Sequence, residues 1–353
     1  MEGSREQNER GPCYPVDALT SWSWDMLRQS SEEYVSKLHS TDCPGAQYFS
    51  LLTGEKIPIR KSSVSWLSTC RENSEHVVLI LFKPKEQQTV LALHLNGKWW
   101  SVEDVLKTSN SSRQNLVQVR SIGERIVLYV LNQIICGLWE TSPGDVPFLI
   151  HPANEYAKVF WQQGEAAGFY TVKLKGSLCD DCTSQCYQLS VLDTVFVRRK
   201  YRRLGFGLQI LHDFRCTFPE DHELGISHPI SPTMYKVCHK YLQSHPDEQE
   251  HLWEVEVPGY PGQRANVWLT IHMGQNSPVR APDSSTLTMH TEDEEEGQER
   301  GCEGRIGVAA SKGGNPGGSS LPDISENNSD DKTPMEKRLK RKRKIEDFSE
   351  VSN

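Results

Sequence analysis

The chain has 353 residues and a formal net charge of -8, with 36% hydrophobic residues and nine tryptophans. This length suggests two domains or one large domain with tails, and the apolar content suffices for a sizeable core. The negative charge argues against general nucleic-acid binding, although it does not exclude a local basic patch.

Targeting segments and disulfides are not expected. No apolar run reaches about 18 residues, and the charged N-terminus lacks an apolar stretch, so we expect neither a membrane span nor a secretory signal. Ten cysteines in a chain of this length are too sparse for a disulfide framework. With no export signal, we interpret them as reduced thiols.

The first region, residues 1–146, is predicted to fold as an α/β unit that carries no catalytic motif. A capping-box spacing from Ser30 to Glu33 predicts a short helix there. The other predicted elements are strands at 76–82 and 89–95, an Asn96-Gly97 turn, a short helix at 101–107 and a buried helix from 124 that ends near Gly137. Six tryptophans invite an aromatic ligand site, but packing in a core or interface is the favoured interpretation: Trp22, Trp24, Trp66, Trp99, Trp100 and Trp139.

The second region, residues 147–275, is predicted to alternate strands and helices. Its predicted strands are 146–150, 168–175, 187–197, 224–226, 252–257 and 265–273, the last two joined as a hairpin. Its predicted helices are 154–163, which Gly164 stops, 207–214, and 231–242, with Ser231 as N-cap and Pro232 at the first helical position. Such alternation predicts an α/β fold (an α+β mixed sheet) covered on both faces. The sequence leaves open whether the two regions form one domain.

A basic stretch with two glycines joins a strand to a helix in this second region. The strand ends at Val197, five cations follow, and Gly205 and Gly207 open the helix. The first turn of a helix offers unpaired N–H groups and a positive dipole end, and glycines let a pyrophosphate approach the backbone. The five cations would add charge-assisted contacts: Arg198, Arg199, Lys200, Arg202 and Arg203. The stretch therefore predicts a polyanionic ligand; the alternative is a glycine-punctuated loop with a solvated basic face.

This stretch resembles the acyl-CoA pyrophosphate loop of the Gcn5-related N-acetyltransferase superfamily. Five residues match that family's usual pattern: Val197, Tyr201, Arg202, Gly205 and Gly207. Arg199 stands where proline is common and Arg203 where glycine is common. The resemblance implies a Gcn5-related N-acetyltransferase-like domain over residues 147–275 and acetyl-CoA or another acyl-CoA as cofactor. The implied cofactor-binding residues are Val195, Val197, Arg202, Arg203, Leu204, Gly205, Phe206 and Gly207.

Acetyl transfer also requires an amide that holds the thioester carbonyl, a base and an acid. The strand from Val195 to Val197 is expected to supply the amide. Asp193 is the candidate base, because it shares strand parity with those valines, although it could instead pair with a nearby arginine. Many family members carry a tyrosine acid where Cys238 stands here, so Tyr235 is the nearby candidate and water is the alternative.

Three closely spaced cysteines form a second constellation. Cys179, Cys182 and Cys186 have the spacing of a zinc knuckle, with a fourth ligand to come from His212, Cys216 or His222. The alternative is three reduced thiols in a polar loop.

The last region, residues 276–353, is rich in Gly, Ser, Pro and acidic residues and is predicted to be disordered. Lys337–Lys344 packs seven cations into eight residues, which predicts a nuclear-localisation signal bound by a nuclear import receptor. The alternative is a solvated charge run that balances the acidic residues 292–296.

The layout as a whole, with its Trp-rich first region, basic loop and basic tail, is also similar to the family with sequence similarity 169. That family includes a soluble lamin-associated protein, so the resemblance implies nuclear-lamina partners at the nuclear periphery. We therefore expect an acyl-CoA-binding, N-acyltransferase-like nuclear protein whose acceptor the sequence does not identify. The alternative is a catalytically inactive interaction protein with the same fold. Specific nucleic-acid binding is disfavoured, because no recognition helix or Cys/His module is present.

Overall fold

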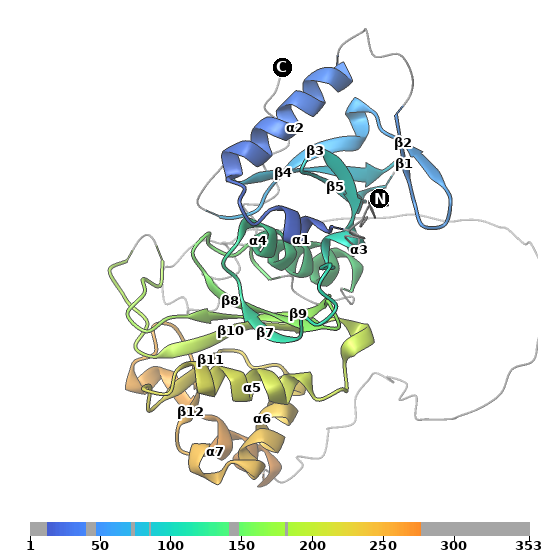
Figure 1. Ribbon diagram of the computed structural model, residues 1–353. Coiled ribbons are helices and arrows are strands. Elements are labelled where there is room, and N and C mark those ends of the chain that lie inside the picture. Colours follow the sequence, from blue (N-terminus) through green and yellow to red (C-terminus); the bar gives the residue numbers. More distant parts are fainter. Residues whose placement is uncertain are drawn as a thin grey trace, which may run out of the picture. The chain divides into compact units, whose positions relative to one another are not determined.

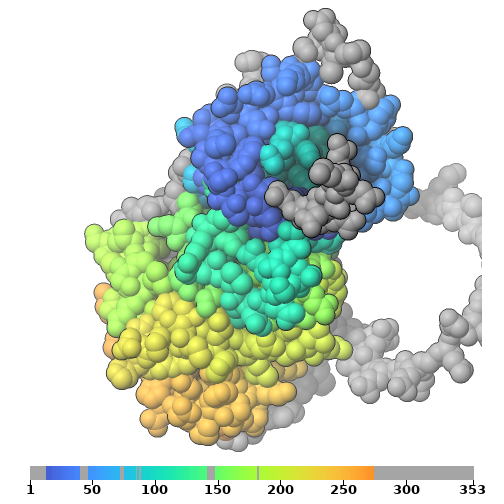
Figure 2. Space-filling view, viewed as in Figure 1, coloured from blue at the N-terminus to red at the C-terminus, as the bar shows by residue number. Residues whose placement is uncertain are grey.

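A computed structural model describes residues 13–39, 47–71, 75–84, 86–140, 148–180 and 183–276. These residues form alternating layers of helix and sheet within one unit of the chain (Figure 1). In the space-filling view the blue and teal atoms of the N-terminal part lie directly against green and yellow atoms of later segments (Figure 2). The predictions for the tail and for Cys182 fall outside the described residues.

A four-stranded antiparallel sheet with the order β3-β4-β5-β6 forms the first layer of strands. Its strands are β3 (Val64–Ser68), β4 (Val77–Lys83), β5 (Glu86–Leu95) and β6 (Lys98–Ser101), preceded by the β1–β2 pair (Tyr48–Ser50 and Lys56–Pro58). Asn96 and Gly97 have φ values of 51° and 71°, which confirms the predicted turn. The short helices of this part are α1 (Pro15–Ala18), η1 (Lys61–Ser63) and α3 (Val102–Val105), the last within the predicted 101–107 helix.

Helix α2 (Trp24–His39) covers the outer face of this small sheet (Figure 1). The prediction that a short helix starts at Ser30 was wrong, because Ser30 and Glu33 lie inside α2. The hydroxyl of Ser23 accepts a hydrogen bond from the N–H of Met26 at 3.2 Å and caps the helix. The Ser-x-x-Glu spacing therefore matched the capping-box pattern of a helix N-terminus although it lies inside the helix.

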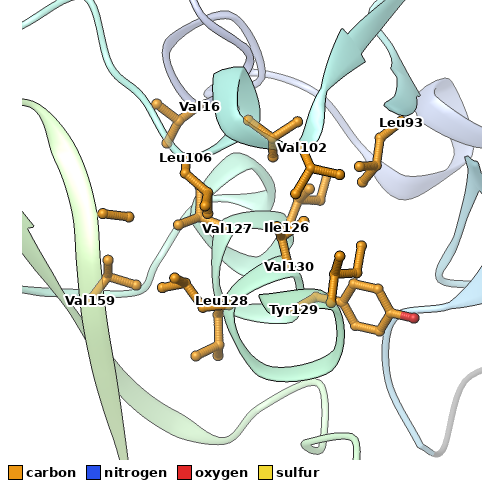
Figure 3. Packing of buried hydrophobic residues seen from close by; sticks show 14 of the residues in the cluster. Val16, Leu93, Val102, Leu106, Ile126, Val127, Leu128, Tyr129, Val130 and Val159 are labelled. Atoms are coloured by element: carbon orange, nitrogen blue, oxygen red, sulfur yellow. The ribbon is translucent and has the colours of Figure 1, made fainter. Parts of the chain in front are cut away.

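A long apolar helix fills the space between the small sheet and a second, larger sheet. It comprises α4 (Ile122–Tyr129) and its π-helical continuation η2 (Val130–Trp139), and Ser121 and Glu124 form a capping box at its start. Ile126, Val127 and Val130 are fully buried against residues of both sheets (Figure 3). The predicted buried helix is thus confirmed.

The same helix, Ile122–Trp139, is by length and composition apolar enough to cross a membrane. Core helices of globular proteins share that property, and more than half of this one is buried in the structure. It is therefore weak evidence for a span, and the absence of a membrane segment stays a prediction.

The second sheet has seven strands in the order β13-β12-β11-β10-β9-β8-β7. Its strands are β7 (Asn115–Gln118), β8 (Tyr156–Gln162), β9 (Glu165–Lys173), β10 (Ser190–Val197), β11 (Leu224–Ser227), β12 (Leu252–Val255) and β13 (Arg264–Asn266). The pairs β10–β11 and β11–β12 are parallel and the others antiparallel. The strands predicted over 168–175, 187–197, 224–226 and 252–257 are confirmed as β9, β10, β11 and β12.

Helices cover both faces of this mixed sheet, as predicted. The α4–η2 helix packs on one face, and α5 (Phe206–Thr217), α6 (Pro232–Ser244) and α7 (Val267–Asn276) lie on the other (Figure 1). Three single-turn helices lie in connections: η3 (Arg199–Tyr201), η4 (Pro246–Glu248) and η5 (Pro261–Gln263). Ser231 caps α6 by accepting from the N–H of Met234, which confirms the predicted start.

Three predicted elements were wrong. Residues 154–163 form strand β8 and not a helix, since Val159 packs on the α4 face of the sheet and Phe160 on the α5 face. Residues 265–273 form only the end of β13 before α7 begins, and Asn266 caps that helix by accepting from the N–H of Leu269 at 2.9 Å. Residues 148–150 form no strand.

Candidate functional site

The basic loop closes with two residues in the left-handed region at the start of α5. Arg203 has φ of 65° and Gly205 has φ of 82°, and Gly205 is the N-cap of the helix. Within the described part of the chain, the five consecutive backbone N–H groups from Arg203 to Gly207 donate to no protein acceptor. Arg203, Leu204 and Gly205 are exposed, whereas Phe206 is buried and Gly207 half-buried, so the first three donors of this row are open to a ligand.

A glycine is required at each of the two loop positions for a different structural reason. Gly205 needs its positive φ, and a Cβ atom there would meet nothing within 4 Å. A Cβ atom at Gly207 would lie 3.1 Å from Cγ1 of Val237, so this glycine lets α5 approach α6 closely. Gly205 therefore leaves open space beside the row of donors, whereas Gly207 also serves packing.

Most cations of the loop are engaged by carboxylates from distant parts of the chain. Arg198 is only 4% exposed and binds Glu103 of α3 through Nη2, at 2.8 and 2.9 Å from its two carboxylate oxygens. Its Nη1 and the Nζ of Lys200 both bind Glu165 of β9. Arg198 therefore stabilises the loop from within, whereas Lys200 pairs with Glu165 from an exposed position.

Glu140, at the end of the central helix, holds the next part of the loop. Its Oε2 accepts from the N–H of Arg199 at 2.8 Å and lies 3.3 Å from Nη2 of Arg202. Nε of Arg202 donates to the carbonyl of Val197 at 2.9 Å. The guanidinium of Arg199 donates to the carbonyl of Glu140 at 2.8 Å, whereas the exposed side chain of Arg203 makes no hydrogen bond or ion pair with the described residues.

Strands β10 and β11 separate directly before the loop. Their parallel pairing covers only Ser190–Leu192 of β10 and ends at Ile226 of β11, although β10 continues to Val197. The register of β10 against β9 shifts between Leu192 and Thr194, so Asp193 occupies a β-bulge. This bulge interrupts the strict alternation on which the predicted parity of Asp193 with the valines depended.

The last part of β10 presents an edge that β11 does not pair. The N–H of Arg198 donates to the carbonyl of Ala167 on β9 at 2.9 Å. Because backbone groups alternate along an antiparallel strand, those of Val195 and Val197 point to the opposite, unpaired edge. The structure therefore places Val195 and Val197 beside the donor loop.

The two predicted catalytic residues have different surroundings. Asp193 is half-buried, and its Oδ1 accepts from the hydroxyl of Ser227 at 2.6 Å; no arginine binds it among the described residues. Tyr235 of α6 donates its hydroxyl hydrogen to Oε2 of Glu254 on β12. Burial and this hydrogen bond raise the pKa of Tyr235 well above its ordinary value, so it stays protonated near neutral pH.

Sequence reasoning missed the partners that surround Tyr235. Glu254 is buried, and its Oε1 also accepts from Nδ1 of His228 at 2.9 Å and from the N–H of Ile230 at 2.9 Å. A carboxylate at a buried strand position was a signal in the sequence, since such a group requires partners. A half-exposed His228 next to the end of β11 gave no comparable signal.

The cysteine constellation is only partly described. Cys179 and Cys186 lie in the loop between β9 and β10, where Leu178 and Cys186 form an isolated β-bridge. His212 and Cys216 lie on α5, on the face of the sheet opposite to the cluster against which Cys179 packs. The described residues contain no group of three metal-ligating side chains, and Cys182 is outside them.

A cavity of about 430 Å³ lies apart from the loop, between α5, α6 and the β7–β8 edge of the large sheet. It is lined by Asn115, Leu116, Phe160, Leu208, Gln209, His212, Asp213, Tyr241, Ser244 and His245. None of the predicted catalytic or cofactor-binding residues lines it, and of the candidate zinc ligands only His212 does.

The fold and site thus define a mixed α/β protein with an open row of backbone donors at a helix start. Over 278 residues, 78% of this chain and 81% of its relative, the chain is 45% identical to Protein FAM169B of Mus musculus. It is also 48% identical over 138 residues to Protein FAM169BP of Homo sapiens, covering 38% of this chain and 68% of that one. No family model matches the sequence. The chain belongs to the FAM169B family.

Proposed function

We propose that this protein binds an acyl-CoA at the start of α5, within a domain of the Gcn5-related N-acetyltransferase type. The observation that carries the proposal is the row of five backbone N–H groups from Arg203 to Gly207, which have no protein acceptors in the described residues and of which the first three belong to exposed residues. Consecutive N–H groups at a helix start favour a phosphate or pyrophosphate. The side chain of Arg203 adds one exposed positive charge.

The unpaired edge of β10 supports a position for the part of the acyl-CoA that carries the acyl group. A chain bound with its pyrophosphate at the loop would extend along Val195 and Val197, whose backbone N–H groups, with the carbonyl of Val195, can take up its amides and the thioester carbonyl; the carbonyl of Val197 already accepts from Arg202. Asp193 lies at the bulge where β10 and β11 separate, and Tyr235 lies on α6, hydrogen-bonded to Glu254 of β12. These positions support an N-acyltransferase with Asp193 as base and Tyr235 as acid.

A second candidate function is acyl-CoA binding, or interaction alone, without turnover. The observation in its favour is that the hydroxyl hydrogen of Tyr235 is directed at Glu254 and not toward the strand edge. An acid so engaged would be poorly placed to protonate a leaving thiolate. On this view the fold serves an interaction protein at the nuclear periphery.

Calorimetric titration of the full-length protein with acetyl-CoA tests the binding proposal. We expect saturable binding by the wild type and at least about a tenfold weaker affinity, or 1.4 kcal/mol, for Arg203→Glu. Reversal of this exposed charge places a carboxylate beside the row of donors without touching the core. Lys240→Glu, an exposed charge reversal on α6, is the matched control and should bind like the wild type.

Two outcomes would contradict the proposal. The absence of any heat of binding when the folded wild type is titrated with millimolar acetyl-CoA would exclude the acyl-CoA site. Equal losses in Arg203→Glu and Lys240→Glu would indicate a general charge effect and not a contact at the loop. Binding without any acyl transfer would favour the second candidate function.

We also propose a nuclear setting, supported by the basic run Lys337–Lys344. A fluorescent fusion of the full chain should accumulate in nuclei, and replacement of the seven cations of this run by alanine should abolish the accumulation. Unchanged distribution of the variant would reject the run as an import signal.

A further inference from the structure

A cluster of titratable side chains lies at the carboxyl ends of β11 and β12. The buried carboxylate of Glu254 is at its centre, with His228 and Ile230 donating to Oε1 and Tyr235 to Oε2. Because a carboxylate only accepts, Nδ1 of His228 carries the hydrogen of this bond. Burial and, to a lesser degree, the charge of Glu254 raise the pKa of the Cys238 thiol on α6 to about 12.

This cluster lies at the same end of the sheet as the proposed acyl-CoA loop. Ser227, which directly precedes His228, donates to Asp193 at the point where β10 and β11 separate. On the other side, Gly207 of the loop lies against Val237 of α6, two residues after Tyr235. Ser227 and Asp193 thus connect His228 to the part of β10 that precedes the loop, and the helix that carries Tyr235 packs on the helix that follows it.

The imidazole of His228 is fixed at one nitrogen and faces a second carboxylate with the other. Its side chain is 45% exposed, and Nε2 lies 3.9 Å from Oε1 of Glu256, which is 63% exposed. A buried carboxylate at Nδ1 fixes the tautomer of the neutral ring, so that its lone pair lies on Nε2. Glu256 adds a negative charge at the surface where an incoming cation would approach.

We propose that His228, oriented by Glu254, accepts the proton of the acyl acceptor, and that Glu256 makes a cationic primary amine the preferred acceptor. This inference rests on the proposed function and replaces Asp193 as base. An imidazole is better matched than a carboxylate to deprotonate an ammonium group near neutral pH. Asp193, held by Ser227, then acts as a positioning residue at the bulge.

The reaction balances without a further reactant. The ammonium gives one proton to Nε2 of His228, and the nitrogen lone pair so released forms a C–N bond with the thioester carbonyl carbon. The C–S bond breaks with its electron pair on sulfur, and the second amine proton goes to the thiolate to give CoA thiol. His228 returns its proton to the solvent.

The test measures CoA thiol released by the full-length protein from acetyl-CoA, with Nα-acetyl-lysine amide as a cationic acceptor and aniline as a neutral one. His228→Gln should lower kcat by about 100-fold or more and remove the acidic limb of the pH profile. Acetyl-CoA affinity, measured by calorimetry, should remain unchanged. His239→Gln, a histidine of α6 outside the cluster, should behave like the wild type.

Glu256→Gln separates selection of the acceptor from proton transfer. It should raise KM for the lysine derivative several-fold, leave kcat nearly unchanged, and leave aniline kinetics unaffected. Bound acetyl-CoA with no acylation of the lysine derivative, or full activity of His228→Gln, would overturn this inference while leaving acyl-CoA binding intact. A wild type that fails to bind acetyl-CoA would instead overturn the proposed function and, with it, this inference.

Discussion

Arg198 shows at the scale of one residue why a cation in a basic loop need not serve a ligand. It is buried between carboxylates of two other segments, Glu103 and Glu165. Arg198→Met should lower the free energy of unfolding by about 2–4 kcal/mol, because it leaves these carboxylates without their shared partner. Urea unfolding measures the change.

Lys200→Met is the matched control, since Lys200 binds the same Glu165 from a position 48% exposed. Its loss should cost less than about 1 kcal/mol. Similar costs for the two variants would contradict the structural role of Arg198.

His94 gives the fold a dependence on pH. It is buried beside Ser31, and burial lowers its pKa from 6.5 to about 4. Below pH 6.5 His94 is therefore protonated in the unfolded state but stays neutral in the folded state. The free energy of unfolding consequently falls as the pH drops from 6.5 to about 4. The loss from this residue approaches about 3 kcal/mol at the lower pH.

The measurement is urea unfolding at several pH values between 7 and 4 for the wild type and His94→Gln. The variant should lose stability at every pH but show a shallower decline with acidification. Parallel declines would show that His94 does not carry this dependence.

At the scale of elements, the central helix makes a close backbone contact with α1 that the sequence did not predict. A Cβ atom at Gly123 of α4 would lie 2.9 Å from the backbone Cα and O of Val16 in α1. Gly123→Ala should therefore destabilise the protein by about 1–3 kcal/mol. In the same helix a Cβ atom at Gly137 meets its nearest neighbour at 3.5 Å, so Gly137→Ala should be neutral or stabilising by up to about 1 kcal/mol. Thermal unfolding distinguishes the two, and a larger loss at Gly137 would contradict the packing.

Element types could be predicted from sequence where one signal dominated. β9 and β10 coincide with long apolar runs, and the start of α6 is marked by the N-cap Ser231 and by Pro232 at the first helical position. The sequence of β8 was wrongly predicted as a helix, because the apolar residues that a strand places on both faces of a covered sheet also satisfy a helical spacing. α7 was missed because Val267 and Ile271, four residues apart, also fit a strand, while the capping role of Asn266 went unused.

At the scale of the whole molecule, the larger sheet is built from both predicted regions. β7 comes from the first region and pairs with β8, and the central helix of that region covers the sheet. We expect residues 147–276 alone not to fold, because they lack this strand and expose the α4 face, whereas residues 13–276 should fold. Circular dichroism with urea titration decides, and a cooperative transition of the shorter fragment would contradict the expectation.

The same scale explains what sequence could not predict about the site. The donor loop and its glycines were recognised locally, as were Asp193 and Tyr235 as candidates. The carboxylates that engage the loop cations lie far away in sequence, Glu103 at 95 positions from Arg198. Likewise Glu254 meets Tyr235 only after α6 has packed on β12. Such pairings depend on the tertiary fold and leave no local pattern.

The central claim, that an acyl-CoA binds at the start of α5, is tested most directly by amide hydrogen exchange of the full-length protein with and without acetyl-CoA. With acetyl-CoA bound, we expect slower exchange in peptides that contain residues 203–207 and along the strand edge 195–197. Slower exchange confined to the cavity residues 208–213 and 241–245, or none anywhere, would contradict it.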